Sequence, residues 1–183
     1  MFRKLPEYLG DYCMDNLDLP PGGRPNYTFS AGVLSGRATT ISIQPESGSS
    51  WVGSFIGDPS YRRGITGLYG TPSPDHLCVL ERGTAFVVDA RHPMATLLVP
   101  SDGPVRDVQP VVDAGVLLLA TPWTVTAVGT GRIAWTSPRL AIEGLRLDDV
   151  HEHYLLGVAD PDEDEPREFA IDLRTGALVD GAD

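Results

Sequence analysis

Residues Val116–Val128, with the sequence VLLLATPWTVTAV, decide the fold class that we predict for this chain of 183 residues. The run Val116–Ala120 is continuously apolar, as in a strand that is covered on both faces. From Trp123 to Val128, threonines alternate with apolar residues, which is typical of a second strand. The turn residues Gly129–Gly131 then lead into a third short run, Arg132–Trp135. The pattern predicts antiparallel strands joined by tight turns.

The same order of runs occurs three times along the chain, and this repetition predicts a tandem architecture. The continuously apolar runs are centred on Cys78, Leu118 and Leu156, at spacings of 40 and 38 residues. The runs that follow them are centred on Val88, Val128 and Ile171. The two centres of a unit lie 10, 10 and then 15 residues apart, so the last unit carries an insertion of five residues.

Each unit also has a candidate strand on either side of these two runs. Before the apolar run they are residues 64–69, 105–112 and 144–150, and after the second run they are residues 95–99, 132–135 and 177–179. Four short strands in about 40 residues are typical of a propeller blade. We therefore expect an all-β fold of propeller-like tandem four-stranded antiparallel units, with a β-sandwich as the alternative.

Residues 26–63 do not follow the repeat, but they also have the pattern of strands. The candidate strands are residues 26–30, 38–44 and 50–56. They could supply a fourth unit that closes a minimal ring, or they could cap the edge of an open meander. The sequence leaves both arrangements open.

Two stretches resemble repeats of the quinoprotein (PQQ-like) β-propeller family. They are Ala127–Trp135, AVGTGRIAW, and Ala170–Val179, AIDLRTGALV. In such repeats an apolar-Asp-x-x-Thr-Gly stretch forms the outer hairpin of a blade, with Thr-Gly at its turn. The first unit keeps Asp89 without Thr-Gly, and the middle unit has Gly129 in place of the Asp. The resemblance spans about residues 64–180 and implies architecture only. It carries over no quinone, no other cofactor and no site residue.

Residues 1–25 are interpreted as a lead-in segment, and residues 26–183 as a single all-β domain. The boundary is placed at Pro20–Gly23, PPGG, because these residues continue neither a helix nor a strand. Within the lead-in segment, a short helix is expected from Leu5 to Met14.

The charge balance restricts the class of partner. Twenty-five acidic residues oppose 14 basic ones, which gives a formal charge of -11 at pH 7. Such a surface repels phosphate groups, so nucleic acid and anionic membrane surfaces are disfavoured. A basic protein partner would be attracted. The competing interpretation is that the charge only keeps the protein in solution. The sequence leaves open whether the chain forms a homo-oligomer.

The insertion of the last unit is the acidic segment Asp160–Pro166, DPDEDEP, which we place at a hairpin tip. Its carboxylates are the candidate partner contacts, namely Asp160, Asp162, Glu163, Asp164 and Glu165. The calcium-loop template of EF-hands is not met, because Glu165 stands where that loop needs Gly and Ile171 where it needs Glu. The segment is either a solvated tip or a contact surface for a basic partner.

The triplet His151-Glu152-His153 is the most suggestive candidate for metal chemistry. Residues two apart in a strand share a face, so both imidazoles could reach one ion. The triplet is expected in a turn, however, and no distant third ligand is evident. We therefore assign no metal site. A small metal-dependent hydrolase or sugar-active protein that uses His151 and His153 is kept as the alternative function.

Signals for a catalytic nucleophile and for phosphate-binding glycines are missing from the sequence, so no catalytic or cofactor-binding residue is assigned. The function we expect is a non-enzymatic protein-interaction module of bacterial type, whose acidic surface engages a basic protein. One concrete version is an immunity or accessory protein that neutralises a cationic toxin.

The cysteines and tryptophans complete the prediction. Cys13 and Cys78 are too few for a disulfide scaffold, and the first residues lack the apolar run of a secretory signal, so a cytoplasmic protein with reduced cysteines is expected. Cys78 is expected in the core. The three tryptophans, Trp51, Trp123 and Trp135, are expected to pack between units rather than to form a ligand platform.

Overall fold

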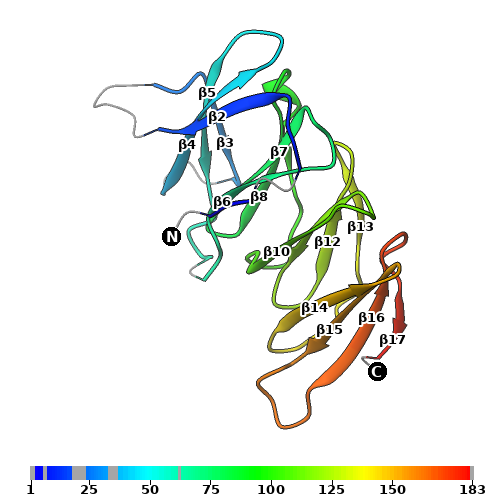
Figure 1. Ribbon diagram of the computed structural model, residues 1–183. Helices are drawn as coiled ribbons and strands as arrows, with labels where there is room; N and C mark the ends of the chain where they lie inside the picture. Colours follow the sequence, from blue (N-terminus) through cyan, green and yellow to red (C-terminus); the bar gives the residue numbers. More distant parts are fainter. Residues whose placement is uncertain (1–2, 6–7, 18–23, 33–36, 62, 182–183) are drawn as a thin grey trace.

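The structure is a computed structural model that describes residues 3–5, 8–17, 24–32, 37–61 and 63–181. The described chain is all-β and forms four sheets, which we number I to IV in their spatial order (Figure 1). Sheet I contains β2 (Tyr12–Asn16), β4 (Ala38–Pro45), β5 (Trp51–Ile56) and β3 (Tyr27–Ser30). Sheet II contains β1 (Arg3–Leu5), β6 (Gly67–Gly70), β7 (His76–Glu81), β8 (Thr84–Asp89) and β9 (Leu97–Leu98). Sheet III contains β10 (Asp107–Val111), β11 (Val116–Ala120), β12 (Val125–Val128) and β13 (Ile133–Thr136), and sheet IV contains β14 (Leu145–His151), β15 (Tyr154–Ala159), β16 (Arg167–Asp172) and β17 (Leu178–Asp180).

The predicted tandem β architecture is confirmed. Sheets III and IV are four-stranded antiparallel meanders in chain order, and β6 to β9 repeat this pattern in sheet II. Among the described strands, two pairs are parallel, β1 with β6 and β3 with β5. The strand predicted at residues 95–99 is shorter in the structure. A 3-10 helix covers Pro93–Ala95, and β9 contains two residues, Leu97 and Leu98. Proline has no backbone N–H to donate to a sheet, and here it begins the short helix instead.

Alternation along each central strand divides the core into three layers. In β11, Leu117 and Leu119 pack against sheet II, while Leu118 packs against sheet IV. In β7, Leu77 and its neighbours on the same face pack against sheet I. The three hydrophobic clusters therefore join sheet I to II, II to III and III to IV. This is why residues 77–80 of sheet II and 116–120 of sheet III are continuously apolar, as expected for strands that are covered on both faces.

Two tryptophans join neighbouring sheets in the same way. Trp51 Nε1 donates a hydrogen bond to the carbonyl oxygen of Ala90 over 2.8 Å, from sheet I to sheet II. Trp135 Nε1 donates to the carbonyl oxygen of Leu173 over 2.6 Å, from sheet III to sheet IV. Each acceptor directly follows the aspartate of the repeat motif in the sequence. Both rings are buried, so these tryptophans pack between units as predicted.

The predicted helix between Leu5 and Met14 is wrong. Residues Arg3–Leu5 form β1 on the edge of sheet II, and Tyr12–Asn16 form β2 on the edge of sheet I. The period of two along β2 decides the outcome, because Tyr12 and Met14 pack against the core between sheets I and II. Part of the predicted lead-in segment therefore belongs to the sheets, and the boundary placed at Pro20–Gly23 lies outside the described residues.

The four sheets form an open row, with sheet I and sheet IV at opposite ends of the molecule (Figure 1). Of the two arrangements that the sequence left open, the strands within residues 26–63 therefore cap one end. Two of the edge strands, β10 and β14, carry features that disfavour pairing with other strands. Pro110 removes a backbone N–H from β10, and β14 is interrupted by an irregularity at Asp148 and Asp149.

The described chain contains one helix, the three-residue segment Pro93–Ala95, and so it holds no helix with the length and apolarity that crossing a membrane requires.

Candidate functional site

The acidic insertion of the last unit lies at the hairpin between β15 and β16, as predicted. The carboxylates of Asp162, Glu163, Asp164 and Glu165 are all on exposed residues. The flanking strands are paired over their full length, from Tyr154 with Asp172 to Ala159 with Arg167. The hairpin therefore presents four negative charges on the end of a regular pair of strands.

Asp160, the first candidate contact, has a different position from the other four. It is only 5% exposed, and its backbone has a φ of 54° at the start of the turn. Its Oδ1 accepts hydrogen bonds from the backbone N–H groups of Ile142 (2.8 Å) and Glu143 (2.6 Å). Its Oδ2 accepts one from Arg167 Nη2 over 3.0 Å. Asp160 thus ties the hairpin to the segment that connects sheets III and IV, and its carboxylate is not available to a partner.

A hollow of about 460 Å³ lies beside this hairpin, and we call it the acidic hollow. It is lined by Ile142, Glu143, Asp160, Glu163, Asp164, Glu165 and Arg167. The Arg167 guanidinium is paired with Asp160, which leaves four further carboxylates along the walls. Ile142 adds an apolar surface, since this residue is 67% exposed. The arrangement is suited to a long cationic side chain whose methylene groups contact Ile142 while its charged end meets the carboxylates.

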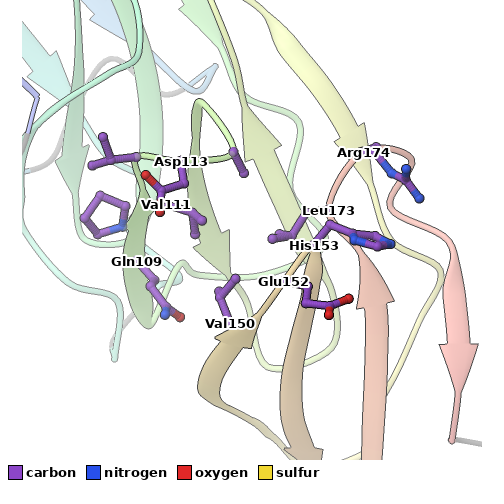
Figure 2. Close-up of a pocket in the computed structure, with 11 residues that line it drawn as sticks. Gln109, Val111, Asp113, Val150, Glu152, His153, Leu173 and Arg174 are labelled. Carbon is purple, nitrogen blue, oxygen red and sulfur yellow. The ribbon is translucent and has the colours of Figure 1, made fainter.

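A larger groove of about 760 Å³ lies between sheets III and IV, on the side of the β10–β11 and β14–β15 turns (Figure 2). Val111, Val150 and Leu173 line its base. In Figure 2 the charged ends of Glu152 and Arg174 point away from the opposite wall, so the charged groups do not converge.

Arg174 is held within its own turn by the aspartate of the repeat motif. Its Nη2 donates to Asp172 Oδ2 over 2.8 Å, and this side-chain hydrogen bond, together with one from the Arg174 backbone N–H, lowers the pKa of Asp172 to about 2. Asp89 occupies the corresponding place in sheet II and accepts hydrogen bonds from the backbone N–H groups of Arg91 and His92. These aspartates stabilise tight turns, as Asp commonly does.

The histidine triplet does not assemble a metal site. Glu152 occupies the turn with a φ of 54°, between His151 at the end of β14 and His153 just before β15. The His153 ring lies against the Tyr154 ring, with 4.1 Å between centroids. Among the described residues, no group of three or more His, Cys, Asp or Glu side chains is arranged to hold a metal ion. The geometry therefore adds no support for the metal-dependent alternative.

Sequence reasoning missed a serine–histidine–aspartate cluster in sheet II. Ser73 Oγ lies 2.8 Å from His76 Nδ1, and His76 Nε2 lies 3.9 Å from Asp89 Oδ2. The second distance is too long for a hydrogen bond, and the serine is only 6% exposed. A Cβ added to Gly131 of sheet III would lie 2.9 Å from Nε2, so the imidazole packs against the β12–β13 turn, and its side chain is 21% exposed. The cluster belongs to the junction between sheets II and III, and the Ser-x-x-His spacing was its only sequence signal.

A buried carboxylate also lies at the junction of sheets I and II. Glu81 is 1% exposed, and its Oε2 accepts a hydrogen bond from Thr39 Oγ1 of β4. The Arg82 guanidinium Nε is 3.9 Å from Oε1. This contact links the two sheets, much as Asp160 links the hairpin of sheet IV to its connecting segment.

No protein-family model matches the chain, and the search of the curated proteins finds no similar sequence. The function is therefore argued from the chain's own geometry.

The two cysteines do not form a disulfide with each other. Cys78 is fully buried, as predicted, and desolvation raises the pKa of its thiol to about 12. Such a thiol stays protonated and unreactive at neutral pH. Cys13 is exposed on β2.

Asp160→Asn should reduce the free energy of unfolding by about 2 kcal/mol at neutral pH, because hydrogen bonds to a charged acceptor contribute about 1.5–3 kcal/mol. Burial alone would raise the pKa of Asp160, but hydrogen bonds from Glu143, Ile142 and Arg167 lower it below its ordinary value. The pKa of an aspartate in the unfolded chain is about 3.9. A carboxyl group whose pKa is lower in the folded state stabilises the fold fully at pH values above the unfolded pKa. This stabilisation is lost as the pH falls through the folded-state pKa.

Urea titrations from about pH 7 to about pH 3 test this expectation. The difference between the wild-type protein and Asp160→Asn should shrink below about pH 4. Asp162→Asn, on the exposed tip of the same hairpin, is the matched control and should change stability little at any pH. Equal losses for the two variants would contradict the structural role of Asp160.

Proposed function

We propose that this chain is a non-enzymatic protein-interaction module that engages a basic protein through the acidic hollow of sheet IV. The observation that carries the proposal is the placement of four carboxylates beside an exposed isoleucine, in a hollow whose own arginine is already paired. Arginine in particular recognises carboxylates through two parallel hydrogen bonds.

The charge of the whole molecule also favours a basic partner. A formal charge of -11 attracts a basic partner over distances longer than any contact and raises its rate of association at low salt. Contacts at the rim of the hollow are expected to affect the association rate more than the lifetime of the complex. The β15–β16 strands hold the hairpin at its base, which reduces the entropy lost on binding.

The cellular role that we propose is that of a bacterial immunity or accessory protein, which acts in the cytoplasm and neutralises a cationic toxin. The charge, the size and the lack of catalytic motifs support this version. A toxin whose active site binds phosphate would present the cationic side chains that fit an acidic hollow.

Affinity capture with four-residue variants tests the proposal. In Asp162→Asn/Glu163→Gln/Asp164→Asn/Glu165→Gln, the tip loses four negative charges without a large change in shape, and three of the four carboxylates line the acidic hollow. The partner captured from the native host should be retained by the wild-type protein at about 50 mM salt and should bind this variant at least about tenfold more weakly.

The matched control removes four exposed carboxylates on other sheets and turns: Asp11→Asn, Asp15→Asn, Glu46→Gln and Asp113→Asn. Both variants have the same net charge, so the control separates the hollow from general charge. If the control weakens capture as much as the hairpin variant does, the hollow is not the contact. Capture that is insensitive to both variants and to about 500 mM salt rejects the electrostatic mechanism altogether.

A further inference from the structure

The first strand of each meander, β6, β10 or β14, has one side that faces away from the next strand, and the fold treats these three sides differently. Pro110 in β10 and the irregularity at Asp148 and Asp149 in β14 disfavour pairing with a further strand. β6, Gly67–Gly70, has no proline and no charged side chain, and it pairs with β7 in a continuous register. The side of β6 that faces away from β7, which we call the acceptor edge, can therefore accept another strand.

The chain covers the acceptor edge with its own short strand β1. The two strands are parallel, with a register that runs from Arg3 beside Gly67 to Leu5 beside Tyr69. The other pairs of sheet II are antiparallel. Parallel pairing is slightly less stable per residue, and a strand of three residues forms few hydrogen bonds to offset the entropy lost when it is ordered. β1 is therefore held more weakly than the strands of the meander.

The segment that follows β1 has contacts of its own, so it does not depend on β1. The Tyr8 hydroxyl donates a hydrogen bond to the carbonyl oxygen of Val116 in sheet III over 2.8 Å. The backbone N–H of Asp11 donates to the carbonyl oxygen of Pro74 over 2.8 Å, and β2 pairs with β4 in sheet I. β1 can thus leave the acceptor edge while the residues after it keep their places.

The acceptor edge stays ordered without β1, because both faces of β6 are buried in the core. Leu68 is 2% exposed and belongs to the cluster between sheets I and II, and Tyr69 is 1% exposed and belongs to the cluster between sheets II and III. A preformed edge lowers the entropy that is lost when a segment binds to it. Its backbone N–H and C=O groups recognise an extended segment, as in the addition of a peptide strand to other sheets.

The strand that covers this edge is basic, although the molecule is acidic. Arg3 and Lys4 are two of the 14 basic residues, and Lys4 is the only lysine of the chain. Without these two charges, the formal charge of the remaining chain changes from -11 to -13, and such a molecule attracts a basic strand. We propose that the acceptor edge binds an extended basic segment of a partner protein in place of β1, which occupies the site intramolecularly.

A peptide titration of the full chain tests the proposal. The probe is the heptapeptide of residues 1–7, blocked at both ends, and the backbone amide resonances of Leu68 and Tyr69 report its binding. In the variant Lys4→Pro/Leu5→Pro, β1 loses an N–H on each side of the strand and cannot pair. This variant should bind the heptapeptide at least about tenfold more tightly than the wild-type protein, in which β1 competes at an effective concentration on the order of 1 mM.

Two altered heptapeptides are the controls for charge and for strand pairing. With Arg3→Glu and Lys4→Glu, the peptide should bind the opened edge at least about tenfold more weakly at about 50 mM salt. With Lys4→Pro and Leu5→Pro, it should leave the β6 resonances unchanged. Thermal melts establish that the protein variant is folded. If it is not, the full-length variant Arg3→Glu/Lys4→Glu replaces it, and this variant should also bind the basic heptapeptide more tightly than the wild-type protein.

The possible outcomes separate this site from the acidic hollow. No binding to the opened edge, equal binding to the opened and wild-type proteins, or equal binding of the basic and acidic peptides overturns the proposal. The opened variant that also carries the four hairpin substitutions should bind the heptapeptide as tightly as the opened variant alone. A loss of binding there would place the peptide in the acidic hollow and would also overturn the proposal. The affinity capture that tests the hollow has no bearing on this result.

Discussion

Leu118→Ala is expected to lower the free energy of unfolding by about 3–5 kcal/mol, while Leu156→Ala should lower it by less than about 1.5 kcal/mol. The two leucines occupy equivalent positions of the repeat, in strands of similar apolar sequence. Leu118 is 0% exposed and packs between sheets III and IV, so its truncation leaves a cavity. Leu156 lies on the outer face of the last sheet, where solvent fills the space of the removed atoms.

Urea titration at a protein concentration of a few micromolar measures both variants. The ratio of the two losses is more informative than either value, because both substitutions remove the same atoms. A closed ring would cover Leu156 with a neighbouring sheet and bring its loss close to that of Leu118. Equal losses would therefore contradict the open row.

Trp135→Ala should cost about 3–5 kcal/mol and should disrupt the junction of sheets III and IV. The indole is buried among Ile171, Leu173 and their neighbours, and its N–H donates to the carbonyl oxygen of Leu173. Its truncation removes apolar contacts from both sheets and leaves that buried carbonyl without its donor. Gly176 shows how close the packing is, since a Cβ there would lie 2.6 Å from the ring.

Trp135→Phe separates the two contributions. Phenylalanine keeps most of the apolar contact but has no N–H, so we expect a loss of about 1–2 kcal/mol from the hydrogen bond and the smaller ring. Trp123→Ala serves as a control, because Trp123 is only half-buried and donates to the carbonyl oxygen of Ile142 outside this cluster. If Trp135→Ala costs no more than Trp123→Ala, the junction does not depend on Trp135.

The sequence predicted most of the strands because their signals are local. The continuous apolar run at Val116–Ala120 and the alternation from Trp123 to Val128 are both visible in the sequence, and they correspond to β11 and β12. The repeat spacing located the hairpins of three sheets, including the acidic insertion. The packing of Trp51 and Trp135 between units also followed from size and apolarity alone, whereas Trp123 is half-buried.

The N-terminal strands could not be predicted in the same way. β1 pairs in parallel with β6, and β2 pairs with β4 across a long connection, so both depend on partners that are distant in sequence. The polar residues of Tyr12–Asn16 give β2 a weak strand signal until its inward face is known. The choice between a ring and a row is also non-local, because it depends on how each pair of sheets twists.

The candidate site was predicted in outline and not in detail. The repeat spacing and the acidic segment placed carboxylates at the hairpin between β15 and β16. They could not separate Asp160, which accepts two backbone hydrogen bonds from residues 142 and 143, from the exposed carboxylates that follow it. Nor could they place Ile142 and Glu163 around the same hollow, since residues so far apart in the sequence meet only through the fold.

The measurement that tests the open row most directly is the distance between its two ends. A spin label on the exposed Cys13 of sheet I and another on Val179→Cys of sheet IV report this distance by pulsed electron resonance, while Cys78 is buried and stays unlabelled. Dilution with unlabelled protein removes distances between copies. Neighbouring sheets lie about 10 Å apart, so three junctions predict a distribution centred beyond about 20 Å. A single population below about 15 Å would mean that sheets I and IV meet and would contradict the account.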